Sequence, residues 1–330
     1  MERDPVLKAA REGREGVKRE LFIHIGYPKT GSKFIQNEIF PRLEEANFVR
    51  SSRIRSEVSR LARQDEFSFN YETTRRNIEK HLLPGKNMIS YEGFIGEFFR
   101  FKLINTKVIA DRLAALFPEA KIIITIRNQY NLIESLYKQY VHVGGTKRFL
   151  DFVNFRKGRF EYAYHDLDFT INVEMFHYLN VIGYYEKLFG RENLLVIPYE
   201  LLKNDPGQFV NRLTAGIGIK QVPAFGNKIY NQGYGSRQIA IARFMNRFLK
   251  SKFRETGLIP DTTFPITGKI DTGKLRLILQ SNLSRRLLGQ KPITDPLLKS
   301  EIKKRFAESN QVLNQRYQLT LETLCPGEYF

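Results

Sequence analysis

Short apolar runs recur along the chain, and each is followed by a segment whose apolar residues have helical spacing. Runs of five or six residues between turn signals are typical of strands buried on both faces of a parallel sheet. These runs predict strands over residues 21–25, 87–91, 121–126 and 194–199. After the first run, a turn containing Gly and Pro leads into a helical pattern formed by Phe34, Ile35, Ile39 and Leu43.

Helical periodicity dominates the rest of the chain. It predicts helical patches within 50–82 and helices over residues 105–117, 128–143, 173–189, 206–217, 236–250, 274–288 and 295–317. Strands that alternate with helices predict an α/β fold with three layers, in which helices flank a central, mainly parallel sheet. Ligands of such sheets bind at the carboxyl ends of the strands, where the strand-to-helix turns lie.

The pattern also predicts the organisation of the chain. Residues 1–20 form a charged N-terminal arm, and residues 21–330 form one domain with helical and loop insertions. Between 144 and 172 the periodicity loosens and Phe and Tyr accumulate, which indicates an insertion close to the substrate. From about residue 236 the domain is helical.

Composition is that of an ordinary globular protein, with 42% hydrophobic and 27% charged residues among 330. Neither an apolar run of about 18 residues nor an apolar signal segment is present, so we expect a cytoplasmic protein. Cys325 is the only cysteine, which excludes an intrachain disulfide and a cysteine-based metal site.

A net charge of +18 favours an anionic partner. The sequence contains no nucleic-acid-binding module, so we predict no nucleic-acid partner. Peripheral contact with the anionic inner face of a membrane is a further expectation from the charge. No feature of the sequence specifies an oligomeric state.

The loop after the first predicted strand reads GYPKTGSK from Gly26 to Lys33. Backbone N–H groups between a strand and a helix form an anion site. A P-loop kinase has its Lys directly after the second Gly, whereas here Ser32 follows Gly31 and Lys29 precedes it. Arg127 also stands where a magnesium-binding carboxylate is expected, which makes a kinase the weaker interpretation.

Two motifs together resemble the PAPS-dependent sulfotransferases of bacterial type (PAPS is 3′-phosphoadenosine 5′-phosphosulfate). HIGYPKTGSKFIQ resembles their phosphosulfate-binding loop, and IRNQYNLIESLYKQY places Arg127 and Ser135 at the spacing of their second motif. VIPYELLKNDPGQFVNRLTAGIGI and FAESNQVLNQRYQL resemble later blocks, so the likeness covers most of residues 21–320.

The resemblance implies a P-loop NTPase-like sulfotransferase fold, PAPS as donor, PAP as product and no metal. The donor-binding residues that it implies are Tyr27, Pro28, Lys29, Thr30, Gly31, Ser32, Lys33, Arg127, Ser135 and Arg237. Lys29 would neutralise the bridging oxygen of the leaving group. Arg127 and Ser135 would hold the 3′-phosphate, and Arg237 or its loop would reach the nucleotide.

Sulfonate transfer needs a base for the acceptor proton. Glu92 follows a predicted strand and is the favoured candidate, and His142 is a second one. His24 lies within an apolar run, so we expect a hydrogen-bonded core histidine there.

We expect the acceptor to be a hydroxyl on a carbohydrate or glycolipid, by analogy with the family and from the basic, aromatic composition. Two alternatives remain open. One is a magnesium-dependent nucleotide kinase of P-loop type, and the other is a non-catalytic polyanion-binding protein.

Overall fold

The computed structural model describes residues 18–161, 169–226, 234–253, 257, 263–264, 268–269, 282–289 and 291–330. The chain forms two compact units. The first comprises Met1–Asn128, Met175–Lys228 and Ala307–Phe330, and the second comprises Gln129–Glu174 and Ile229–Phe306. The predicted insertion at 144–172 falls within the second unit, whereas most of the predicted N-terminal arm lies outside the described residues.

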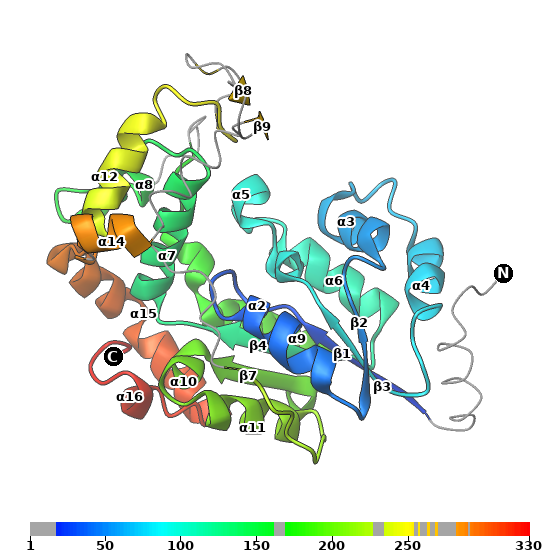
Figure 1. Ribbon diagram of the computed structural model, residues 1–330. Coiled ribbons are helices and arrows are strands. Elements are labelled where there is room, and N and C mark those ends of the chain that lie inside the picture. The colour runs from blue at the N-terminus through cyan, green and yellow to red at the C-terminus, as the bar shows by residue number, and fades with distance from the viewer. Residues whose placement is uncertain are drawn as a thin grey trace. The chain divides into compact units, whose positions relative to one another are not determined.

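A five-stranded sheet is the centre of the first unit, and all its strand pairs are parallel. Its order is β2-β3-β1-β4-β7, with helices flanking it (Figure 1). The strands are β1 (Arg19–His24), β2 (Ala46–Val49), β3 (Gly85–Ser90), β4 (Lys121–Ile126) and β7 (Leu194–Pro198). The predicted α/β class with a central parallel sheet is therefore confirmed.

The burial of a strand's side chains explains whether the strand could be predicted from the sequence. The four isoleucines of β4, at positions 122, 123, 124 and 126, are at most 1% exposed, and β-branched side chains suit a strand covered on both faces. The sequence did not predict β2, which is an edge strand of four residues paired only with β3. Only Val49 of β2 is buried, so this strand lacks the run of buried apolar residues from which a strand can be predicted.

Helices of the first unit follow most of the predicted segments. They are α2 (Ser32–Phe34), η1 (Ile35–Ile39), η2 (Phe40–Arg42), α3 (Arg55–Arg63), α4 (Tyr71–Glu79), η3 (Glu92–Ile95), α5 (Phe98–Phe101), α6 (Thr106–Leu116), α9 (Tyr178–Phe189), η5 (Arg191–Asn193), α10 (Tyr199–Asn204), α11 (Pro206–Gly216) and α16 (Leu321–Leu324). The short α10 was not predicted. It ends before Asp205, whose side chain accepts from the backbone N of Gln208 at 2.9 Å and caps α11.

The second unit contains α7 (Gln129–His142), α8 (Phe149–Phe152), the strand pair β5 (Phe155–Arg156) and β6 (Arg159–Phe160), α12 (Ser236–Met245), the strand pair β8 (Thr263–Phe264) and β9 (Gly268–Lys269), and α14 (Asn282–Leu288). By its residue numbers, η4 (Val173–Phe176) and α15 (Pro296–Tyr317) each have residues in both units. Part of the predicted helix 274–288 lies outside the described residues.

Aromatic residues of the predicted insertion pack into the core of the second unit. The rings of Tyr140 and Phe152 lie 5.0 Å apart, and those of Tyr140 and Phe169 lie 5.6 Å apart and stack. Tyr137 packs on Phe149 at 5.0 Å. Across the described part of the chain, no helix is both long enough and apolar enough to cross a membrane.

Candidate functional site

The loop from Gly26 to Lys33 leaves the carboxyl end of β1 and leads into α2. The chain keeps bonding to β4 after β1 ends, with Ile25 N donating to Ile123 O at 3.0 Å and Tyr27 N donating to Thr125 O at 3.2 Å. It then turns sharply, because Lys29 and Gly31 have left-handed φ angles of 66° and 92°. Such alternation of backbone conformation forms a concave nest of N–H groups that suits an anion.

Both glycines of the loop stand at close approaches. A Cβ on Gly26 would lie 2.0 Å from Thr125 Oγ1 and 2.7 Å from His24 Nε2. A Cβ on Gly31 would lie 2.6 Å from a methyl of Leu202 on α10. The loop is therefore packed tightly against β4 and α10, and larger residues would displace it.

A chain of buried hydrogen bonds lies beneath the loop. Ser90 Oγ lies 2.7 Å from His24 Nδ1, and Thr125 Oγ1 lies 3.3 Å from His24 Nε2. Thr125 Oγ1 also lies 2.7 Å from Thr30 Oγ1, which donates to the carbonyl of Tyr27. The chain thus connects β3, β1 and β4 to the loop backbone. The expectation of a hydrogen-bonded core histidine at position 24 is confirmed.

This chain of bonds runs in one direction when His24 is neutral. Thr30 donates its only hydroxyl hydrogen to the Tyr27 carbonyl, so Thr125 donates to Thr30 and accepts from His24 Nε2–H. The neutral ring then accepts at Nδ1 from the Ser90 hydroxyl, which itself accepts from Gln36 Nε2 at 3.0 Å. Burial lowers the pKa of His24 to about 3, in agreement with a neutral ring.

Three polar groups at the loop are buried without a hydrogen-bond partner among the described residues. They are the hydroxyls of Tyr27 and Ser32 and the Nε of Arg127. Leaving a buried polar group unpaired costs about 1–3 kcal/mol, so such groups call for a ligand or water. A phosphate oxygen accepts from both hydroxyl and guanidinium donors, and Ser32 and Arg127 therefore fit an anionic phosphate group.

Arg127 is positioned directly against the loop. It follows β4, and its Nη1 donates to Lys29 O at 3.1 Å. Its guanidinium lies over the ring of Tyr199 at 4.7 Å, and the hydroxyl of Tyr178 donates to its carbonyl at 2.6 Å. The loop and Tyr199 thus hold the side chain of Arg127, while Tyr178 holds its backbone.

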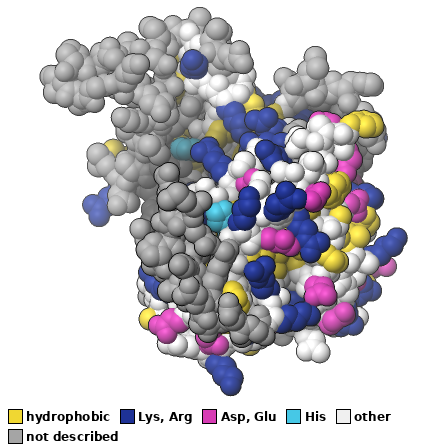
Figure 2. Space-filling model, turned by 90° about the vertical axis from the view of Figure 1, so that its right-hand side faces the viewer, with side chains coloured by type: hydrophobic (Ala, Val, Ile, Leu, Met, Phe, Trp, Pro, Cys, Tyr) yellow, Lys and Arg dark blue, Asp and Glu magenta, His cyan; other side chains and the backbone are white. Residues whose placement is uncertain are grey.

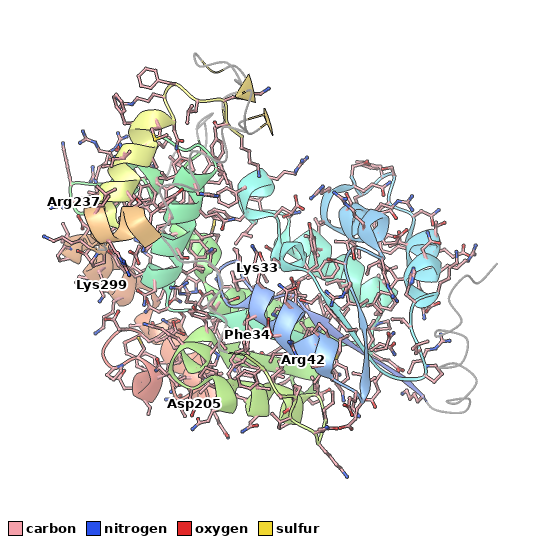
Figure 3. All side chains as sticks on the ribbon, in the orientation of Figure 1. Lys33, Phe34, Arg42, Asp205, Arg237 and Lys299 are labelled. Atoms are coloured by element: carbon pink, nitrogen blue, oxygen red, sulfur yellow. The ribbon has the colours of Figure 1, made fainter. Side chains whose placement is uncertain are left out.

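Lys29, Lys33 and Glu92 are close enough to interact electrostatically. Glu92 begins η3, directly after β3 and Tyr91. Burial raises the pKa of the Glu92 carboxyl, and the positive charges of Lys29 and Lys33 oppose this rise. Lys29 is half-buried, whereas Lys33 is exposed at the start of the helical segment, with Arg42 at its far end (Figure 3). The structure thus brings the predicted base close to both lysines of the loop.

Glu200 is a buried residue of this region to which the sequence assigned no role. Its Oε1 accepts from Asn128 N at 2.9 Å, next to Arg127, and its Oε2 accepts from the hydroxyl of Tyr329 at 2.7 Å. It thereby fixes the turn that carries Arg127. The only signal in the sequence was the PYE tripeptide at the end of β7, which belongs to a block that resembles the family.

Three predicted site residues lie in the second unit. Ser135 is half-buried on α7, and Arg237 is exposed on α12 (Figure 3). His142 ends α7, and its Nδ1 lies 2.8 Å from the hydroxyl of Tyr234. Their participation in the site of the first unit stays a prediction.

Solved structures of sulfotransferases are among those similar to this chain. A sulfotransferase from Alicyclobacillus acidocaldarius has a TM-score of 0.46 and 17% identity, over 65% of this chain and 87% of that one. Mouse sulfotransferase SULT7A1, solved in complex with PAP, has a TM-score of 0.41 and 13% identity, over 94% and 92%. The sulfotransferase domain from the curacin biosynthetic pathway has a TM-score of 0.33 and 15% identity, over 62% and 75%.

The assignment to a family rests on sequence. No curated protein matches the chain at a significant level. A sequence model of the sulfotransferase family, Sulfotransfer_3, matches residues 21–223, which is more than half of the 330 residues. That span contains the loop, Glu92 and Arg127. The chain therefore belongs to the sulfotransferase family.

Proposed function

We propose that this protein transfers the sulfonate group of PAPS to a hydroxyl of its acceptor and releases PAP. The observation that carries this proposal is the presence of unpaired buried donors, Ser32 Oγ and Arg127 Nε among them, at a loop with the geometry of an anion nest. PAPS matches such donors, because the oxygens of its 5′-phosphosulfate and of its 3′-phosphate accept hydrogen bonds and carry negative charge. Membership of the sulfotransferase family supports the same chemistry.

The loop would hold the 5′-phosphosulfate of the donor. In this arrangement the backbone N–H groups of Thr30, Gly31, Ser32 and Lys33 and the Ser32 hydroxyl bind the phosphate, while Tyr27 and Pro28 shape the turn. Thr30 keeps its own hydroxyl on the Tyr27 carbonyl, which fixes the curvature of the loop. Arg127 and Ser135 are assigned to the 3′-phosphate, and Arg237 to the nucleotide.

The transfer step requires one cation and one base. The acceptor oxygen forms a bond to sulfur while the bond between sulfur and the bridging oxygen breaks. Lys29 stabilises the charge that grows on that bridging oxygen. Glu92 accepts the proton of the acceptor hydroxyl, and its raised pKa makes it a stronger base than an exposed carboxylate. His142 is the second candidate base.

Thermal unfolding with nucleotides tests the donor site. We expect PAP to raise the melting temperature more than AMP, ADP or ATP with magnesium, because only PAP carries the 3′-phosphate. Arg127→Ala should abolish this preference. Arg75→Ala, which removes an exposed arginine paired with Glu79 on α4, should retain it. An equal response to ATP with magnesium would instead support the kinase alternative.

Replacement of Lys29 tests the chemical step. Lys29→Ala should lower kcat by at least about 100-fold, the scale of losing one transition-state donor, with little change in melting temperature. Lys220→Ala is the matched control. The backbone N of Lys220 donates to Glu45, which lies just before β2, so this lysine is at the amino-terminal ends of the strands and the proposed site is at their carboxyl ends. Full activity of Lys29→Ala would show that Lys29 does not have this role. If the unmodified protein instead bound polyanions without PAP and without turnover, the non-catalytic alternative would be favoured.

The acceptor that we propose is a hydroxyl on a carbohydrate or glycolipid. The family implies a hydroxyl-bearing acceptor. The net charge of +18 is consistent with a glycan that bears anionic groups.

A further inference from the structure

Three arginines follow directly after the edge strand β2. Arg50, Arg53 and Arg55 are all exposed, and none has an acidic partner among the described residues. Arg53 N donates to Arg50 O at 2.9 Å, so a tight turn brings them together. Arg50 is held further by the ring of Phe48, 5.6 Å from its guanidinium. We call these three residues the β2-end arginines.

Their lack of partners contrasts with the basic residues that follow in the sequence. Arg63 pairs with Glu97, Arg75 with Glu79, and Arg76 with Glu72. Arg112 is buried and binds Glu66. On the face of the molecule in Figure 2, basic side chains in dark blue are plentiful and acidic ones in magenta are interspersed. Unpaired charge is therefore a property of the β2-end arginines and not of every arginine of this unit.

The arrangement is electrostatically unfavourable in the unbound protein. Arg55 is the first residue of α3, where the helix dipole is positive, and a cation there costs about 0.3–1 kcal/mol. Arg50 and Arg53 add two like charges to the same turn. An anion bound at this turn removes both penalties.

Strand register places the β2-end arginines on the edge of the sheet that carries the proposed active site. Val49 is level with Ile89 of β3, and Ile89 is level with Ile23 of β1. The carboxyl ends of these three parallel strands therefore lie side by side. With neighbouring strands about 4.8 Å apart, the end of β2 lies about 10 Å from the end of β1. The end of β3, which carries Glu92, lies between them.

We propose that the acceptor carries an anionic group, which the β2-end arginines bind while the acceptor hydroxyl lies at Glu92. This inference rests on the proposed function. The anionic group is a carboxylate or a phosphate or sulfate ester, because guanidinium groups bind all of these through paired N–H···O bonds. Its place is about two strand spacings from the transferred sulfonate.

A lipid surface is the less suitable occupant of the β2-end arginines. Ile54 is the only apolar residue between Arg50 and Arg55, and it is fully buried. The turn therefore presents charge without an apolar side chain that would enter the acyl region of a bilayer. A soluble or glycan-borne anion matches this surface.

Matched acceptor pairs test the proposal with PAPS as donor. The first pair is unsulfated chondroitin and its carboxyl-reduced form, the second is p-nitrophenyl β-glucuronide and β-glucoside, and the third is glucose 6-phosphate and glucose. We expect kcat/KM for the anionic member of at least one pair to exceed that for its neutral partner about tenfold or more. The first two pairs detect a carboxylate and the third detects a phosphate. Raised salt should reduce the difference, since exposed charges are screened.

The double variant Arg53→Gln/Arg55→Gln identifies the residues responsible. It should raise KM for the anionic acceptor about tenfold, with kcat unchanged, and should leave the melting temperature equal or higher. Lys220→Gln, at the amino-terminal ends of the strands, should leave KM unchanged. Stabilisation by PAP should be intact in both variants, because neither changes the donor loop.

Different results would overturn the inference and the function beneath it. Preference for the neutral member in every pair, absence of transfer to any anionic member, or an unchanged KM in the double variant would overturn the anionic acceptor. Failure of PAP to stabilise the unmodified protein would instead overturn the proposed donor. The two failures are thus distinguished by separate measurements.

Discussion

Because His24 is buried and neutral, we predict that the protein loses stability in acid. Its ring is fully buried, and burial lowers its pKa from 6.5 to about 3. Between these two pH values the unfolded chain binds a proton that the folded protein does not. Stability is therefore highest above pH 6.5 and falls as the pH drops towards 3.

The size of this effect follows from the same shift. Each pKa unit corresponds to about 1.4 kcal/mol. Lowering the pH from 7.5 to 5.0 should therefore lower the free energy of unfolding by about 2 kcal/mol through His24 alone. Protonation would also give Ser90 a second donor facing it, where Gln36 already donates.

Urea unfolding at pH 7.5 and 5.0 measures this contribution. The unmodified protein should be compared with His24→Asn, whose amide oxygen can accept from Ser90 but does not titrate. The difference in unfolding free energy between the two should narrow by about 2 kcal/mol at the lower pH. Equal losses in the unmodified protein and His24→Asn would refute a neutral, buried His24.

Two further predictions concern backbone and charge. Gly31→Ala should abolish stabilisation by PAP, because φ at Gly31 is +92° and the new Cβ would lie 2.6 Å from a methyl of Leu202. Gly226→Ala should retain this stabilisation, because no atom lies within 4 Å of the Cβ that it would add. Arg112→Gln should lower the free energy of unfolding in urea by about 3 kcal/mol, because three backbone carbonyls lose the buried guanidinium as their donor, at about 1 kcal/mol or more each. Arg76→Gln, in an exposed pair, should cost at most about 1 kcal/mol, and equal losses would contradict this account.

Local pattern was sufficient for four of the five strands of the sheet. Those strands contain runs of buried apolar residues, and β4 matches its predicted bounds of 121 and 126. The pattern failed at β2 and α10, where few side chains are buried and the hydrophobic signal is correspondingly weak. It also extended the helix from Ser236 to residue 250, although α12 ends at Met245.

Local sequence was sufficient to locate the loop and its neighbours, because Lys29, Glu92 and Arg127 each lie just beyond a strand with a recognisable apolar run. Which polar groups meet there depends on how the chain folds. His24 and Ser90 are 66 residues apart, Thr30 and Thr125 are 95 apart, and Glu200 and Tyr329 are 129 apart. These contacts depend on strand order and register, which bring distant residues to one edge of the sheet and leave no trace in local periodicity.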